Sequence, residues 1–138
     1  MTNPNFMNEY CNFVDQVTSD PSKNLWAYVD RLKEIHTKYP TINFARLDTG
    51  ATGLNAEAGE LLEIVKKVKF QGKPLEEDAV VHLKKELGDC FWYIAQVCLA
   101  LNVSMEEIMT MNVEKLKARY PDVSFSVERS ENRKVGDI

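Results

Sequence analysis

Residues 54–67, LNAEAGELLEIVKK, contain the pattern that decides the fold. Glu57 and Glu60 are three residues apart, and the segment ELGD repeats this spacing with Glu86 and Asp89. Residues three apart lie on one face of an α-helix, so each pair presents two carboxylates side by side. We expect two helices that pack together and direct four carboxylates into one groove. The expected apolar stripe beside the first pair consists of Leu54, Ala58, Leu61, Leu62, Val65 and Val68.

Four oxygen ligands in one groove favour a hard dication. Mg²⁺ prefers carboxylate oxygens, and Mn²⁺ is a possible substitute. Neither pair contains a histidine, which argues against the Glu-x-x-His arrangement of di-iron bundles. The alternative is a solvated helix surface in which glutamates pair with nearby cations, because Glu60 and Glu63 precede Lys66 and Lys67 at helical spacings.

The remaining chain predicts further helices and almost no strand. Apolar residues recur with a helical period on both sides of the acidic pairs, and Pro40, Gly72 and Pro121 interrupt this period. Ser104 and Glu107 form a capping box that opens the last helix. We expect an all-α protein, a helical bundle of about four to five helices. The expected segments are helices at about 5–18, 22–38, 52–69, 76–101 and 104–120, a loop at 39–50 and a polar tail at 122–138.

Length and composition favour one domain over residues 1–138. Its expected parts are N-terminal helices and loop (1–49), a catalytic helical core (50–121) and the tail. A net charge of −4 provides no basic surface for nucleic acid, and no run of 18 apolar residues predicts a membrane span. Three cysteines are an odd number, which is typical of a reducing compartment. We expect a cytoplasmic protein, in the host cytoplasm if it is phage-encoded.

The last expected helix carries an unusual polar face. Ile108, Asn112, Lys115 and Arg119 follow one another at spacings of four, three and four residues. An amide, a lysine and an arginine on one face are suited to a polyphosphate. Lys67, at the end of the first acidic helix, is a further candidate cation. The alternative for the face is a solvated helix end, and for Lys67 it is a favourable interaction with the helix dipole.

The segments GLNAEAGELLEIVKK, KKELGDCFWYIAQV and NVEKLKARYP, in this order, resemble the MazG-like all-α nucleoside triphosphate pyrophosphohydrolases, including the dCTP pyrophosphatases. The resemblance covers about residues 50–121, and the tail SENRKVGD is similar to that of short phage and bacterial members. The family's first acidic motif often begins with two adjacent glutamates, whereas this chain has Ala56 before Glu57. This difference removes one candidate base.

The resemblance implies Mg²⁺-dependent hydrolysis of a nucleoside triphosphate to the monophosphate and pyrophosphate. The expected substrate is a dNTP such as dCTP or dGTP. It further implies a homodimer or homotetramer, a dimer of dimers, with the site completed across subunits. The implied residues are Glu57, Glu60, Glu86 and Asp89 for the metal, Glu60 or Glu57 for catalysis, and Asn112, Lys115, Arg119, Tyr93 and Lys67 for substrate.

Two other functions use the same features. In the first, the chain is a non-catalytic helical interaction protein whose apolar stripes dimerise and whose acidic pairs are salt-bridged surface. In the second, it is a metal-dependent phosphohydrolase of an alarmone or a modified nucleotide. Mg²⁺ binding and nucleotide turnover separate the first from the main hypothesis, and substrate profiling separates the second.

Overall fold

The computed structural model describes residues 5–132, and these residues form helices without any strand. The all-α prediction is therefore confirmed. The chain divides into two compact units, one ending at Ile42 and one beginning at Asn43. The helices are α1 (Phe6–Val17), the short 3₁₀ turn η1 (Asp20–Ser22), α2 (Leu25–Lys38), α3 (Phe44–Gln71), α4 (Glu77–Leu101), α5 (Met105–Arg119) and α6 (Val127–Glu131).

The N-terminal unit contains α1, η1 and α2. Pro21 lies in the 3₁₀ turn, so α2 begins at Leu25, three residues later than predicted. The side chain of Asn24 caps α2 by accepting hydrogen bonds from the backbone N–H groups of Trp26 and Ala27, at 2.9 and 3.2 Å. These bonds satisfy donors that have no partner within the helix.

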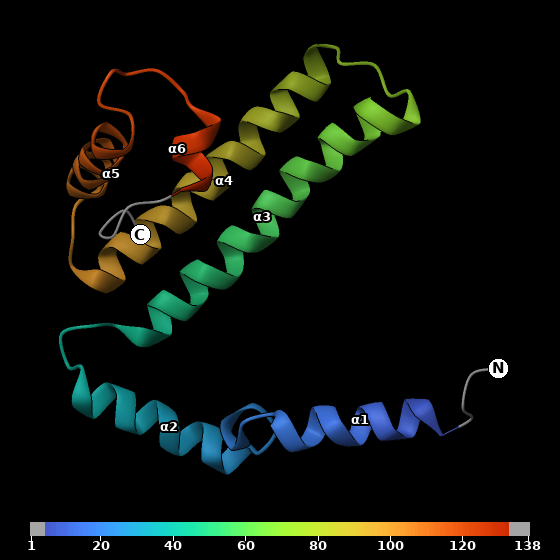
Figure 1. Ribbon diagram of the computed structural model, residues 1–138, viewed down its shortest axis with the longest axis vertical. Helices are drawn as coiled ribbons and strands as arrows, with labels where there is room; N and C mark the ends of the chain where they lie inside the picture. Colours follow the sequence, from blue (N-terminus) through green and yellow to red (C-terminus); the bar gives the residue numbers. More distant parts are fainter. Residues whose placement is uncertain (1–4, 133–138) are drawn as a thin grey trace. The chain divides into compact units, whose positions relative to one another are not determined.

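The second unit is built on α3 and α4, which lie side by side and run antiparallel (Figure 1). The loop predicted at 39–50 is wrong in its second half, because α3 already begins at Phe44. Asn43 caps it by accepting a hydrogen bond from the Arg46 N–H at 3.0 Å. The Asn43 N–H also donates to the Ala100 carbonyl at 3.0 Å, which ties the start of α3 to the end of α4.

Small residues dominate the buried contact of this unit. The buried apolar side chains are Ile64 on α3 and Ala79, Cys90, Cys98 and Ala100 on α4. Part of the expected apolar stripe is wrong, because Leu62 is 65% exposed and Val65 is 44% exposed, whereas Ile64, outside that stripe, is only 4% exposed. Leucine and valine side chains therefore remain on faces that α3 and α4 do not cover.

α5 leaves the end of α4 at an angle of 97°. Asn102, in the left-handed conformation, ends α4, and the Ser104 side chain accepts a hydrogen bond from the Glu107 N–H at 3.0 Å as the capping box predicts. No single helix within residues 5–132 has the length and hydropathy of a membrane span; α4 and α5 together meet that criterion only as a bent pair.

The tail differs from its expectation at one place. No helix was expected in the polar tail at 122–138, but Val127–Glu131 form the short helix α6. Ser126 caps it, and Arg129 forms an ion pair with Asp122. Hydrogen bonds from Arg129 and then Ser124 lower the pKa of Asp122 to about 2. The last part of the tail, residues 133–138, lies outside the described residues.

α3 and α4 lie close together at Gly50, and this contact predicts the effect of adding a methyl group there. A Cβ there would lie 2.7 Å from Val97 Cγ2 and 3.2 Å from the Tyr93 carbonyl oxygen. We expect Gly50→Ala to lower the free energy of unfolding by about 1–3 kcal/mol, because overpacking forces the helices apart. Urea unfolding followed by circular dichroism measures this change.

Gly59→Ala is the matched control on the same helix. Apart from its chain neighbours and the nearby backbone of its own helix, no described atom lies within 4 Å of a Cβ at Gly59. Replacing a glycine by alanine inside a helix then stabilises by up to about 1 kcal/mol. Equal changes for the two variants would contradict close packing at Gly50.

Candidate metal centre

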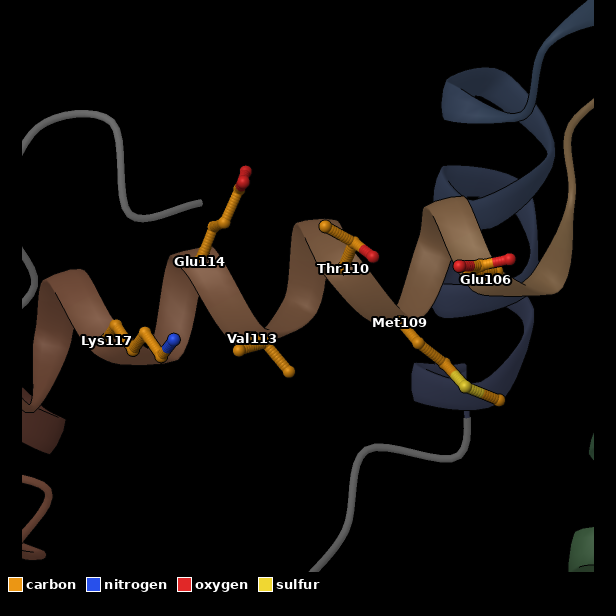
Figure 2. Close-up of a pocket in the computed structure, with 6 residues that line it drawn as sticks. All are labelled: Glu106, Met109, Thr110, Val113, Glu114 and Lys117. Carbon is orange, nitrogen blue, oxygen red and sulfur yellow. The ribbon is translucent and has the colours of Figure 1, made fainter.

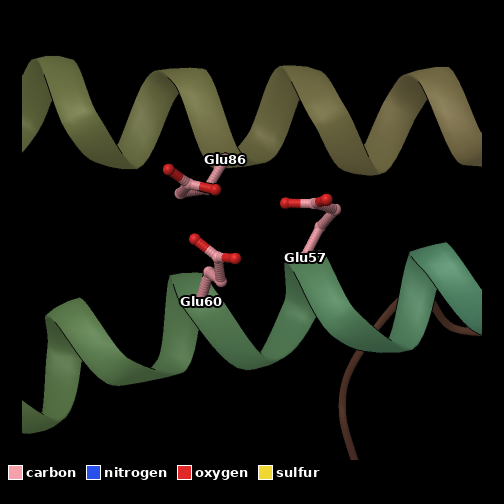
Figure 3. A group of neighbouring side chains, drawn as sticks. All are labelled: Glu57, Glu60 and Glu86. Atoms are coloured by element: carbon pink, nitrogen blue, oxygen red, sulfur yellow. The ribbon is translucent and has the colours of Figure 1, made fainter.

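Three of the four expected carboxylates meet between α3 and α4. One oxygen from each of Glu57, Glu60 and Glu86 lies within 4.8 Å of the others. Figure 3 shows Glu57 and Glu60 extending from α3 toward Glu86, which extends from α4. Glu86 is buried, Glu57 is half-buried and Glu60 is exposed, so the cluster opens to solvent on one side. We call these three residues the acidic cluster.

The acidic cluster disfavours the ionised form of Glu57. Burial makes the largest contribution and raises the pKa of Glu57, followed by the negative charges of Glu60, Asp89 and Glu86. A hydrogen bond with Glu86 favours the protonated form further. Like charges this close repel one another unless a proton or a cation lies between them. A dication bound at the cluster would remove this repulsion.

Asp89 lies beside the acidic cluster without being part of it. Its charge acts on Glu57, but its oxygens do not satisfy the 4.8 Å separation from all three glutamates. Asp89 is exposed and is three residues after Glu86 on α4. A carboxylate beside the cluster can bind a metal ion directly after a side-chain rotation, or it can bind the ion through a water molecule.

His82 is a contact of the cluster that sequence reasoning missed. Its side chain is 51% exposed. However, His82 Nε2 lies 2.9 Å from Glu86 Oε1, one turn before Glu86 on α4. A polar contact of this kind helps to orient a carboxylate that binds a metal. The i, i+4 spacing between His82 and Glu86 is the signal in the sequence.

Tyr93 lies on α4 beyond Asp89, at the end of the cluster away from His82. It is half-buried, and its ring lies against α3 at Gly53. The contacts follow one antiparallel register, because Gly53 is one turn before Glu57 on α3 and Tyr93 is one turn after Asp89 on α4. One turn of helix advances about 5.4 Å.

The candidate phosphate-binding residues lie elsewhere. Lys67 Nζ lies 3.5 Å from Glu63 Oε1 on the same helix. Asn112, Lys115 and Arg119 lie on α5, which diverges from α4 and packs little against α3 and α4. The single chain therefore does not bring the α5 residues together with the acidic cluster.

A shallow hollow of about 520 Å³ runs along a different face of α5 (Figure 2). It has two carboxylates and one lysine, and it contains none of the three α5 residues predicted to bind substrate. Its negative side chains make it a poor site for a polyphosphate. The lining residues are Glu106, Met109, Thr110, Val113, Glu114 and Lys117.

The acidic cluster fits a divalent cation by its own chemistry. It offers only oxygen donors, one of them buried, and its glutamates have a charge excess that a dication removes. Mg²⁺ and Mn²⁺ prefer such oxygen donors, whereas zinc sites usually contain cysteine or histidine ligands. Glu57, Glu60 and Glu86 would hold the ion, with Asp89 next to them.

Comparison with known proteins gives two matches and one negative result. Residues 47–124 match the family model described as the MazG nucleotide pyrophosphohydrolase domain. The Gene 37 protein of Mycobacterium phage L5 is 35% identical over 68 residues, which are 49% of this chain and 60% of that protein. The aligned part of the chain therefore spans less than two thirds of that relative's length. No solved structure matches the chain.

The raised pKa of Glu57 predicts that its charge destabilises the metal-free fold. The stability contribution of the protonated group is fully present below the ordinary glutamate pKa of about 4.3 and is lost as the pH rises through the higher pKa of the folded state. We expect Glu57→Gln to raise the melting temperature at pH 7 without metal. It should also reduce the increase in melting temperature that Mg²⁺ gives the wild type.

Glu63→Gln is the control for this measurement. A hydrogen bond from Lys66 is the largest cause of the lowered pKa of Glu63, so its charge is favourable in the folded state. Scanning calorimetry should find no increase in melting temperature for this variant. A higher melting temperature in Glu63→Gln than in Glu57→Gln would contradict the assigned electrostatics.

Proposed function

Because the match to residues 47–124 shows that the chain belongs to the MazG nucleotide pyrophosphohydrolase family, we propose that it hydrolyses a nucleoside triphosphate to the monophosphate and pyrophosphate. The substrate class we propose is a dNTP such as dCTP or dGTP. The acidic cluster between α3 and α4 is the observation that carries this proposal, since it offers carboxylate oxygens where a metal–triphosphate complex needs them.

In this proposal Glu57, Glu60, Glu86 and Asp89 bind Mg²⁺, or Mn²⁺ in its place. The bound ion would neutralise phosphate charge and lower the pKa of a water molecule. The contact from His82 holds the carboxylate of Glu86 in one orientation. Glu57 itself is half-buried between the two helices.

The chemical step needs a base and a stabilised leaving group. Glu60 or Glu57 accepts a proton from the attacking water, whose oxygen forms a bond to the α-phosphorus. The bond from this phosphorus to the oxygen bridging to the β-phosphate breaks, and pyrophosphate leaves with the electron pair. Glu57 and Glu60 both extend from α3 toward Glu86, so either carboxylate can lie beside the attacking water (Figure 3).

The remaining candidate residues bind the substrate. Tyr93 lies beside the sugar, and Asn112, Lys115 and Arg119 bind the phosphates together with Lys67. Cations and an amide stabilise the charge that develops on leaving pyrophosphate. The distance between α5 and the acidic cluster in one chain is consistent with a site completed by α5 of a second subunit.

A homodimer or homotetramer is part of the proposal. α4 exposes large apolar side chains, including Trp92, which is 52% exposed, and Leu99, which is 61% exposed. Apolar faces of this kind are typical of protein interfaces. Size-exclusion chromatography with light scattering measures the assembly directly.

The proposed activity predicts metal-dependent pyrophosphate release. We expect at least one of the eight common NTPs and dNTPs to give equal amounts of monophosphate and pyrophosphate with Mg²⁺ and none with EDTA. Chromatography of the products measures both. Release of single phosphates would contradict the reaction type. If none of the eight nucleotides is hydrolysed, the substrate is a modified nucleotide or the chain is an interaction protein.

The assigned ligands predict a second result. Glu60→Ala and Asp89→Ala should each lower turnover by at least about 100-fold, because each removes a group that acts on the metal or the water. Both residues are exposed, so circular dichroism should show an unchanged helix content. Wild-type turnover in either variant would remove that residue from the site.

A further inference from the structure

We propose that Gly53 is a positioning residue that holds the ring of Tyr93 at the end of the acidic cluster, where the ring binds the nucleoside part of the substrate. The observation behind it is a contact between the ring and the α3 backbone. A Cβ placed at Gly53 would lie 2.0 Å from Cε1, 2.2 Å from Cζ and 2.4 Å from Cδ1 of Tyr93. Only a residue without a side chain leaves the ring this space.

The contact at Gly53 differs from the contact at Gly50. The closest atoms to a Cβ at Gly50 include backbone atoms of α4, so a methyl group there acts on the distance between the helices. At Gly53 the three closest atoms all belong to the ring. A methyl group at Gly53 therefore displaces the ring of Tyr93 and can leave the two helices in place.

The ring of Tyr93 has a second contact, with the indole of Trp92. Trp92 meets Tyr93 edge to face, with ring centroids 4.8 Å apart and an interplanar angle of 88°. Aromatic pairs prefer this arrangement. The Tyr93 ring thus contacts both the α3 backbone and an indole. Because Trp92 is 52% exposed, its fluorescence can report a movement of its neighbour.

The position of the ring suggests what it binds. Gly53 and Tyr93 are each one turn beyond the carboxylates Glu57 and Asp89, in the same direction along the helix pair. One turn advances about 5.4 Å along the helix pair, so the ring lies next to the acidic cluster. A triphosphate held at the acidic cluster then places its sugar or base against the ring. This inference rests on the proposed function.

The test compares a complete nucleotide with inorganic tripolyphosphate, which has the phosphates but neither sugar nor base. The nucleotide is the best substrate of the eight-member panel. We expect Gly53→Ala to raise its KM roughly ten- to a hundredfold, because small displacements of positioning groups have effects of this size. The inhibition constant of tripolyphosphate and the Mg²⁺-induced increase in melting temperature should not change. Gly59→Ala is the matched control and should resemble the wild type in all three measurements.

Two further measurements separate positioning from a general structural effect. In a Trp26→Phe background Trp92 is the remaining tryptophan, and Gly53→Ala should change its emission while Gly59→Ala does not. In a Tyr93→Ala background Gly53→Ala should have no additional effect on KM, because the residue through which it acts is missing. Independent, additive effects of the two substitutions would overturn the proposal.

The other outcomes distinguish this proposal from the one on which it rests. If the wild type hydrolyses the nucleotide and Gly53→Ala has the KM of Gly59→Ala, only the role of Gly53 is overturned. The role of Gly53 is also overturned if Gly53→Ala weakens the binding of tripolyphosphate as much as the binding of the nucleotide. If the wild type neither hydrolyses nor binds any of the eight nucleotides in equilibrium dialysis with Mg²⁺, the proposed function fails and this inference fails with it.

Discussion

The close approach of α3 and α4 is the constraint on which the site depends. Two helices can approach this closely only where at least one lacks side chains, and Gly50 provides that place. The resulting antiparallel register determines which residues face one another across the contact. It brings Glu57 and Glu60 opposite Glu86, so the packing that gives the unit its core also gathers like charges.

This arrangement sets function against stability within one contact. A buried glutamate and two neighbouring carboxylates weaken a helix pair whose buried apolar residues are mostly small. An apolar residue at each position would pack better. The acidic cluster is therefore costly unless it binds something, which is the usual signature of a functional site in a packed contact.

The sequence predicted the parts of this molecule that local chemistry controls. The helices followed from apolar period and caps, as Ser104 illustrates, and the three clustered glutamates followed from their spacing. The start of α3 was missed because Gly50 and Gly53, which are poor helix formers, lie within its first turns. The helix phase was partly wrong because α3 and α4 carry more apolar residues than one contact covers, as the exposure of Leu62 shows. The fit of Tyr93 against Gly53 joins residues far apart in sequence, and spacing alone does not predict it.

The geometry of the helix pair also has a consequence for folding kinetics. Residues 72–76 connect α3 to α4, so contacts near this connection close short loops and contacts near Gly50 close long ones. If the two helices begin to pair at this connection, the acidic cluster forms midway along the pair. The contacts of Gly50 and Gly53 then form last. We expect contacts that form late to control how fast the folded unit opens more than how fast it forms.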